Sequence, residues 1–239
     1  EVNFVDNRQS VVDNINQQGV HLTGVDGEHW IPAKASTTSS DFFPTDIAFI
    51  HTDTNNSAAA AIQANAVLAK QDGWCITFQN GIGNVEKLQH ELGIERVAGG
   101  ISYHSAASPE PGQSFHTNAG KTWIGELDRQ PSERVDALQT TLSNAGFDVQ
   151  IADDIVAIIW SKFVLNCAVN PICAITGFRT GEIGTHTAAS EFQKGILDEV
   201  LEVVDARGIS LVGQDPRATV EGLADRLFNR PSMLQHMDA

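Results

Sequence analysis

A lysine and two asparagines are spaced four residues apart in an otherwise apolar stretch, WSKFVLNCAVNP, at residues 160–171. On an α-helix, positions four apart differ by only about 40° around the axis, so Lys162, Asn166 and Asn170 would form one polar stripe. A lysine partly removed from water can have its pKa lowered towards values useful for acid–base catalysis. The pattern alone leaves three interpretations open: a functional site, a solvated helix face, and hydrogen bonds to a neighbouring helix.

Asparagine is a poor helix former, and exposed helix faces usually carry Glu, Lys and Gln instead. A buried polar stripe is costly unless a partner or a ligand satisfies it. Pro171 follows directly after Asn170 and removes a backbone donor, so it could bend the helix there and expose that amide. These features favour a functional stripe over a solvated face.

A second candidate group lies near the start of the chain. The strand-like segment EVNFVD ends in Asp6, where the second strand of a Rossmann fold often carries an acidic residue for the adenosine ribose. Asp6 could equally cap the helix that we predict over 7–18. Arg8 could bind a 2′-phosphate or be an ordinary surface arginine. GIGNVE at 81–86 has two of the three fingerprint glycines and follows a late strand, so it is no dinucleotide fingerprint.

The elements that must position these residues follow two different patterns. In the first half, buried strands at 47–52, 73–81 and 96–105 alternate with helices, as in a parallel sheet covered on both faces. Such sheets bind ligands at the carboxyl ends of their strands, where HTDTNN and QNGIGN lie. We also predict an antiparallel hairpin over 114–127.

From Asp154 onward the pattern is helical throughout. The fold class we predict is therefore α/β: a Rossmann-type doubly wound sheet over residues 1–152, followed by an all-α domain over residues 153–239. The sequence holds no G-x-G-x-x-G and no P-loop, which by itself counts against a nucleotide-dependent enzyme.

Composition excludes several classes of partner. The net charge of −15 argues against nucleic acid and against an anionic membrane surface, because phosphate contacts need clustered Lys and Arg. The longest apolar run, IVAIIW, is far shorter than the ~20 residues of a membrane span. The acidity fits simple solubility or a salt-adapted host.

The cysteines and histidines carry no metal-binding pattern. Cys75, Cys167 and Cys173 lack CxxC spacing and lie in apolar contexts, so we expect buried free thiols in a reducing, cytoplasmic compartment. The eight histidines show neither HxxxH nor HxH spacing. We therefore predict no metal site.

Four motifs, in this order and spacing, resemble ketopantoate reductase (2-dehydropantoate 2-reductase): QNGIGN at 79–84, WSKFVLNCAVNPICAITG at 160–177, GEI at 181–183 and PSML at 231–234. The resemblance covers essentially the whole chain. It implies a Rossmann domain joined to a helical domain of the 6-phosphogluconate-dehydrogenase type. It also implies reduction of ketopantoate to pantoate with NADPH, a step towards pantothenate, and relatives of this kind are often homodimers.

The resemblance further implies a role for each site residue. Lys162 would be the general acid that protonates the carbonyl oxygen as hydride reaches its carbon. Asn166 and Asn170 would hold the hydroxyl and keto groups of the substrate, and Ser232 would bind its carboxylate. Asn80 would lie near the nicotinamide and the substrate. Asp6 and Arg8 would contact the cofactor.

Three departures from the family pattern qualify this reading. The amino-terminal strand and its glycine-rich turn are missing, so we expect about 20–25 further residues upstream, because the sheet would otherwise lack a central strand. The family glutamate after the PSML motif is also missing. Asp53 stands where the family often has a lysine, and together with Asp6 it favours NAD(H) over NADP(H).

Two alternatives to a ketopantoate reductase therefore remain open. One is a related D-2-hydroxyacid dehydrogenase that reduces another 2-keto acid with NADH. The other is a non-catalytic relative that binds a nucleotide or a small acid. Retention of Lys162 together with Asn80, Asn166, Asn170 and Ser232 counts against the non-catalytic relative, because such a protein has no chemical reason to keep them.

Overall fold

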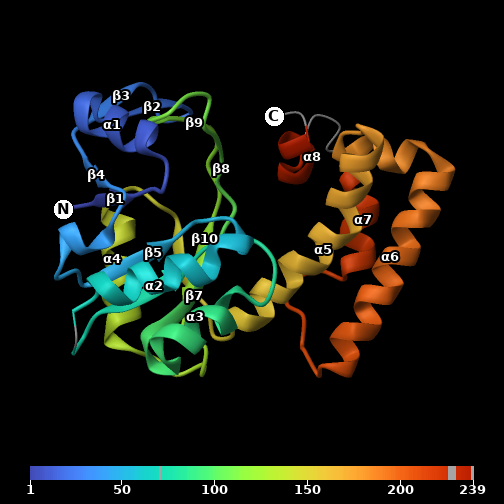
Figure 1. The fold of residues 1–239 in the computed structure, drawn as a ribbon. Helices are drawn as coiled ribbons and strands as arrows, with labels where there is room; N and C mark the ends of the chain where they lie inside the picture. Colours follow the sequence, from blue (N-terminus) through green and yellow to red (C-terminus); the bar gives the residue numbers. More distant parts are fainter. Residues whose placement is uncertain (70, 226–229, 238–239) are drawn as a thin grey trace. The chain divides into compact units, whose positions relative to one another are not determined.

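The computed structural model describes residues 1–69, 71–225 and 230–237. The chain divides into two compact units, Glu1–Ile155 and Val156–Ala239. The first contains all the strands, and the second consists of helices over the residues that the structure describes (Figure 1).

The first unit is built on a five-stranded sheet in the order β11-β10-β7-β6-β5. Its strands are β5 (Ile47–Ile50), β6 (Trp74–Thr77), β7 (Val97–Ser102), β10 (Thr122–Gly125) and β11 (Val149–Ile151). β5, β6 and β7 are parallel, as predicted. β10 runs antiparallel to β7, and β11 runs parallel to β10, so the sheet as a whole is mixed.

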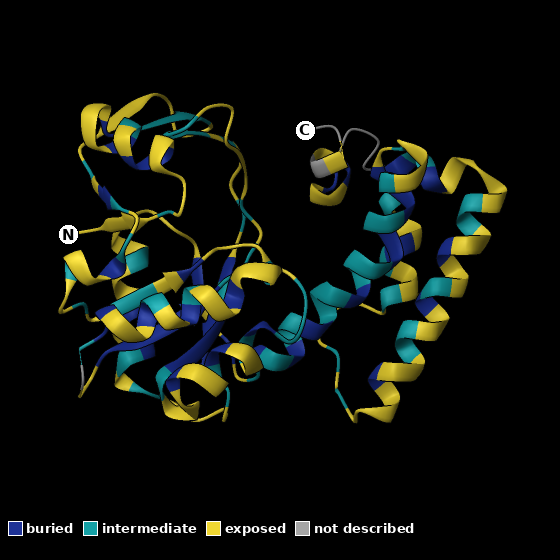
Figure 2. Ribbon diagram, in the orientation of Figure 1, coloured by how far each residue is buried: buried dark blue, intermediate teal, exposed yellow. Residues whose placement is uncertain are grey.

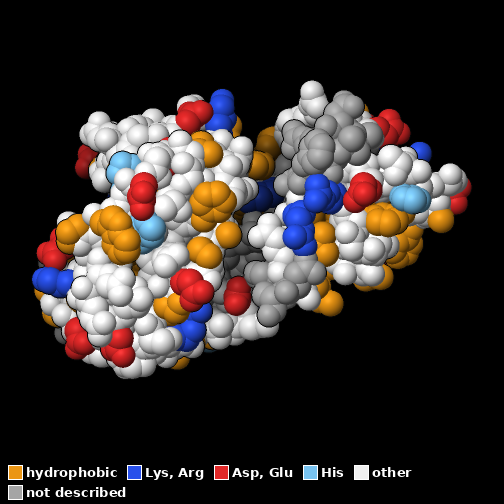
Figure 3. Space-filling model, turned by 90° about the horizontal axis from the view of Figure 1, so that it is seen from above, with side chains coloured by type: hydrophobic (Ala, Val, Ile, Leu, Met, Phe, Trp, Pro, Cys, Tyr) orange, Lys and Arg blue, Asp and Glu red, His pale blue; other side chains and the backbone are white. Residues whose placement is uncertain are grey.

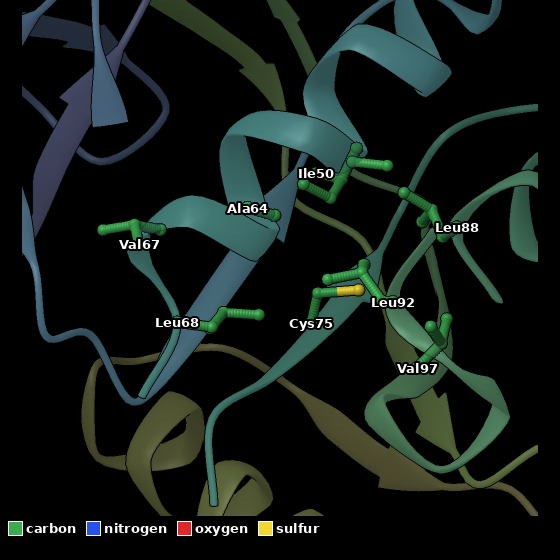
Figure 4. Packing of buried hydrophobic residues seen from close by; sticks show 9 residues of the cluster. Ile50, Ala64, Val67, Leu68, Cys75, Leu88, Leu92 and Val97 are labelled. Carbon is green, nitrogen blue, oxygen red and sulfur yellow. The ribbon is translucent and has the colours of Figure 1, made fainter. Parts of the chain in front are cut away.

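Both faces of this sheet are covered by helices. The interior strand β6 is an apolar run because both of its faces are buried: Cys75 packs on one side, and Trp74 and Ile76 pack on the other. On the Cys75 side, α2 (Ser57–Val67) and α3 (Asn84–Leu92) close a cluster that includes Ile50, Leu88 and Val97 (Figure 4). On the other side, α4 (Glu133–Asn144) contributes Val135 and Leu138. Figure 2 shows buried residues in the strands of this sheet and on the helices that cover it.

Two smaller sheets accompany the five-stranded sheet. β1 (Asn3–Val5) pairs in parallel with β4 (Lys34–Ser36), and α1 (Gln9–Gln18) packs on them through Val11, Val12 and Ile15. A four-stranded sheet has the order β3-β2-β9-β8. Its strands are β2 (Val20–Gly24), β3 (His29–Ile31), β8 (Ser105–Ala107) and β9 (Gln113–Asn118). β2 and β3 are antiparallel and are joined through the turn segment VDGE at 25–28.

The predicted hairpin over 114–127 is wrong. Its two halves, β9 and β10, belong to different sheets: β9 pairs with β2 and β8, whereas β10 pairs with β7 and β11. Gly120 lies between them, and a side chain there would meet the carbonyl oxygen of Tyr103 at 2.3 Å. Local strand propensity is the same for either pairing, so partners distant in sequence decide the outcome.

The second unit begins with the long helix α5 (Ile155–Thr176), followed by η4 (Thr180–Thr185) and α6 (Thr187–Ala206). α7 (Pro216–Glu221), η5 (Gly222–Asp225) and α8 (Ser232–Met237) complete it. Within the segment predicted to be helical, residues 219–221 end α7, residues 222–225 form η5, and residues 226–229 lie outside the described residues. The core of this unit joins Val169, Ile172 and Cys173 of α5 to Ile183 and Leu234.

Within the described part of the chain, α5 is the one helix long and apolar enough to cross a membrane by length and composition. The core helix of a soluble protein meets the same criterion. The search for uninterrupted apolar runs in the sequence did not mark this helix as long and apolar enough for a membrane span. Its apolar residues are interrupted by Lys162, Asn166 and Asn170.

Candidate active site

The carboxyl ends of β5 and β6 form one edge of the sheet, and polar residues gather there. After β5 come Thr52 and Asp53, and Asp53 precedes the short helix η2 (Thr54–Asn56). After β6 come Gln79, which is buried, and Asn80, which is exposed. The turn continues through Gly81 and Gly83, whose φ angles of 90° and 86° favour glycine. The first unit therefore presents Asn80 outward at the edge where doubly wound sheets bind ligands.

Buried side chains connect these two loops. The Gln79 Nε2 atom donates to the carbonyl oxygen of Thr52 at 2.6 Å and lies 3.0 Å from the Ser57 hydroxyl. Ser57 lies 3.0 Å from Oδ1 of Asn84, whose Nδ2 donates to the carbonyl oxygen of Asn80 at 3.0 Å. The turn that carries Asn80 is thus held by hydrogen bonds to the loop after β5.

Asp6 and Arg8 form a close pair beyond the end of β1. One Asp6 oxygen accepts from the Arg8 backbone and from its Nε, at 2.9 and 3.0 Å, and the other accepts from Nη2 at 2.9 Å. These bonds lower the pKa of Asp6 and raise that of Arg8. Arg8, not Asp6, is the N-cap residue of α1, and no side chain caps that helix end. The interpretation of Asp6 as the N-cap residue of this helix is therefore wrong.

Asp53 acts on the same arginine. Its negative charge contributes to the raised pKa of Arg8, although less than Asp6 does. Two carboxylates therefore act on one guanidinium at this corner of the first unit. On the face of the molecule that Figure 3 shows, acidic side chains are spread widely, whereas Lys and Arg occur in a few small groups.

Lys162, Asn166 and Asn170 all lie within α5, as the spacing predicted, and each is half-buried. Burial lowers the pKa of Lys162 from 10.5 to about 8. Pro171 lies inside the helix, which continues to Thr176. Because Pro171 has no backbone N–H, the carbonyl of Cys167 lacks the hydrogen-bond donor that residue 171 would otherwise supply in a helix. Cys167 lies between Asn166 and Asn170 in the sequence.

Ser232 is the first residue of α8 and is exposed. Leu234 of the same helix packs against Val169, Ile172 and Cys173. The second unit therefore brings the start of α8 to the half of α5 that carries Asn170. The predicted residues form two sets: Lys162, Asn166, Asn170 and Ser232 in the second unit, and Asp6, Arg8, Asp53 and Asn80 in the first.

The sequence analysis did not identify two polar features of the structure. In the first unit, Nδ1 of His104 lies 2.9 Å from Nε2 of His116, whose Nδ1 contacts the Asp26 carboxylate. The other ring nitrogen of His104 is buried without a hydrogen-bond partner among the described residues. These residues lie far apart in sequence and have no motif spacing that could have marked them.

The second feature is a cavity of about 370 Å³ in the second unit. Thr180, Gln193, Lys194 and Arg217 are among its lining residues, and the four predicted site residues of that unit are not. Among the described residues, no group of three or more His, Cys, Asp or Glu could hold a metal ion.

Comparison with known proteins adds to this geometry. Residues 1–129 match the family described as "Ketopantoate reductase PanE/ApbA", and residues 154–239 match its C-terminal counterpart. A 2-dehydropantoate 2-reductase from Pyrococcus horikoshii is 29% identical over 224 residues, covering 94% of this chain and 72% of that protein. One from Archaeoglobus fulgidus is 31% identical over 173 residues, covering 72% of this chain and 57% of that protein.

Solved structures share the fold. A 2-dehydropantoate 2-reductase from Geobacter metallireducens superposes with a TM-score of 0.89 at 24% identity, covering 99% of this chain and 79% of that one. A D-mandelate dehydrogenase in a complex with NADH and anilino(oxo)acetate gives 0.85 at 20% identity, covering 97% and 75%. Matched by both family profiles over most of its length, the chain belongs to the ketopantoate reductase family, whose members are NAD(P)-dependent oxidoreductases acting on 2-keto acids.

Proposed function

We propose that this protein reduces ketopantoate (2-dehydropantoate) to pantoate, with Lys162 as the general acid. The observation that carries the proposal is the half-buried lysine on α5, whose pKa is lowered to about 8, followed at four-residue intervals by two amides. Membership of the family supplies the reaction class. The matched part of the chain spans 57% to 78% of the length of three curated relatives. The proposed activity is therefore that of the whole protein.

These residues would stabilise charge on the keto oxygen, donate a proton to it and orient the substrate. A bound reduced nicotinamide supplies the hydride. As negative charge develops on the keto oxygen, the Lys162 ammonium stabilises it more strongly than it stabilises the neutral ketone, and then donates the proton. Asn166 and Asn170 would orient the hydroxyl and keto groups, and Ser232 would hold the carboxylate. Asn80, exposed after β6, would contact the nicotinamide and the substrate.

The residues at the strand ends fit the ribose part of a dinucleotide. One oxygen of Asp6 accepts a hydrogen bond from Nη2 of Arg8, and a carboxylate oxygen has room for another donor such as a ribose hydroxyl. Arg8 is engaged by Asp6 and is also near Asp53, so a 2′-phosphate would have to compete with two carboxylates. We infer a preference for NADH over NADPH.

This cofactor preference favours a second candidate function: reduction of another 2-keto acid to a D-2-hydroxy acid with NADH. A D-mandelate dehydrogenase is among the proteins that share the fold. Either function fits a cytoplasmic enzyme with a small-molecule substrate, and it needs neither nucleic acid nor a membrane. A homodimer is compatible with both.

The decisive experiment is a steady-state assay of the protein made from its complete coding sequence. Ketopantoate is compared with aromatic and branched 2-keto acids, each with NADPH and with NADH. The highest kcat/KM with ketopantoate supports the first candidate, and the highest value with another keto acid supports the second. Nucleotide binding without turnover of any keto acid would refute both and leave the non-catalytic relative.

Lys162→Ala tests the assigned acid. We expect kcat to fall by at least ~100-fold, the scale of general acid catalysis. Lys194→Ala is a matched control, because Lys194 is an exposed lysine on α6 of the same unit and belongs to no proposed catalytic group. Near-normal turnover of Lys162→Ala would refute the role.

Asp6→Ala tests the cofactor inference. Removing this carboxylate frees the Arg8 guanidinium for a 2′-phosphate, so kcat/KM with NADPH should rise relative to that with NADH. Arg8→Ala should not produce this rise, because it removes the phosphate-binding group itself. An unchanged NADPH/NADH ratio in Asp6→Ala would show that the pair has no part in cofactor choice.

A further inference from the structure

Four buried polar side chains form a network behind the turn that carries Asn80. They are Ser57, Thr77, Gln79 and Asn84, with exposed fractions of 0%, 3%, 9% and 2%. Ser57 and Asn84 stand 27 residues apart in sequence, at the first positions of α2 and α3. Buried polar groups lower stability unless they are fully paired, so the pattern of their hydrogen bonds shows what the network holds in place.

Two backbone carbonyls fix the orientation of the two side-chain amides. The Thr52 carbonyl can only accept, so the Gln79 group 2.6 Å away must be its NH2. Its Oε1 therefore faces Thr77, whose hydroxyl donates at 3.0 Å. The Asn80 carbonyl can only accept as well, so the group of Asn84 that lies 3.0 Å away must also be NH2.

These two assignments meet at Ser57. Because Asn84 turns its NH2 to Asn80, its Oδ1 faces the Ser57 hydroxyl at 3.0 Å, and the single proton of that hydroxyl is shared between this oxygen and the Thr54 carbonyl 2.9 Å away. Ser57 in turn accepts from the second N–H of Gln79, also at 3.0 Å. The hydrogen-bonded contacts thus run from Gln79 through Ser57 to Asn84 and reach the backbone of Asn80, the residue next to their starting point, with a branch from Ser57 to the Thr54 carbonyl.

We propose that Gln79, Ser57 and Asn84 are positioning residues that fix the peptide of Asn80 and so aim its side chain at the reacting groups. This inference rests on the proposed function, in which Asn80 contacts the nicotinamide and the substrate. The geometry supports it: the Asn80 carbonyl is held from behind, whereas its side chain is exposed. A displacement of about 1 Å at a reacting group can cost about 100-fold in rate.

A purely structural network would behave differently. Its loss would lower the free energy of unfolding and would reduce activity to the same extent whether or not Asn80 were present. A positioning network acts through Asn80, so its loss should have no further effect once that side chain is gone. A double-mutant cycle separates the two cases.

The cycle uses Asn84→Asp and Asn80→Ala, alone and combined, with kcat/KM measured for the best substrate. Asn84→Asp keeps the shape and the acceptor towards Ser57 but loses the donor to Asn80. We expect a loss of about 10- to 100-fold in kcat/KM from this change alone. In the Asn80→Ala background we expect it to have no effect beyond about twofold. Effects that multiply would overturn the proposal.

Two controls guard against misfolding and against the added charge. Ser57→Ala breaks the link to Asn84 without adding a charge, and its smaller loss should likewise vanish in the Asn80→Ala background. Asn144→Asp makes the same chemical change at an exposed position of α4 and should leave kcat/KM unaltered. Lowering the pH should partly restore Asn84→Asp relative to the native protein, because a protonated carboxyl regains a donor for the Asn80 carbonyl.

Failure of the proposed function can be recognised separately. If the native protein turns over no 2-keto acid, the same cycle is measured on the Kd for NADH and for NADPH. Coupling between positions 84 and 80 in Kd would then support the positioning role, and independent effects would overturn it. A native protein that binds neither nucleotide would overturn the positioning role together with the proposed function.

Discussion

The pKa of Lys162 leads to a prediction about pH dependence in catalysis. Burial lowers this pKa from 10.5 to about 8, which corresponds to about 3 kcal/mol of lost preference for the charged form at 1.36 kcal/mol per pKa unit. At pH 7 the ammonium remains about nine-tenths protonated, so the acid is ready for the reduction. Above the pKa, the rate of reduction should fall by about tenfold per pH unit.

The assay measures kcat/KM in both directions between pH 6 and pH 10. Reduction should decline with an apparent pKa near 8, and oxidation of the 2-hydroxy acid should rise with the same pKa, because it needs the neutral amine as a base. Lys162→Arg should abolish the inflection within this range, since a guanidinium stays protonated throughout. A reduction rate that stays flat from pH 7 to pH 10 would refute the assignment.

The same shift has a consequence for stability. Between pH 8 and 10.5 the unfolded chain binds a proton at Lys162 that the folded chain does not, so the free energy of unfolding should rise with pH across this window. Lys162→Met should therefore stabilise the protein at pH 7 by up to about 3 kcal/mol, less the interactions that the ammonium makes. The gain should vanish above pH 10.5. Urea unfolding at pH 7 and pH 10.5, with Lys194→Met as control, measures the difference.

Two further predictions concern the first unit. Burial, and then the charge of His116, lower the pKa of His104, so its contribution to stability is present above the unfolded value of 6.5 and is lost as the pH falls. The free energy of unfolding should therefore drop less between pH 7 and pH 5 in His104→Phe than in the native protein, as urea titrations would reveal. Ser132 caps α4 by accepting from the backbone N–H of Val135. Ser132→Ala should cost about 1 kcal/mol in thermal or urea unfolding, and an unchanged midpoint would contradict the capping role.

Some elements could be predicted because their signals are local. The strand at β6 and the helix that follows it are marked by an apolar run, by Gly81 and Gly83, and by the apolar spacing of Leu88 and Leu92. The stripe on α5 needs only the helical period. In such cases the sequence within about 15 residues contains all the information that the element requires.

Other features depended on residues far apart in the chain. β9 takes its place beside β2, across a separation that no local pattern reports, so the hairpin predicted over 114–127 paired the wrong strands. The contact between His116 and Asp26 spans 90 residues. The pairing of Asp6 with Arg8 is local, yet the sequence left its geometry open, because the same two residues could cap a helix, bind a ribose or pair with each other.

The two halves of the proposed chemistry therefore differ in what determines them. Proton donation depends on one helix: the 3.6-residue period aligns Lys162 with its amides, and burial of that helix sets the pKa. The position of Asn80 depends instead on hydrogen bonds between loops that follow different strands. Changes at Lys162 should consequently alter the pH profile, whereas changes at Gln79 or Asn84 should lower the rate and leave the apparent pKa near 8. A network mutant that shifted this pKa would show that the two halves are not independent.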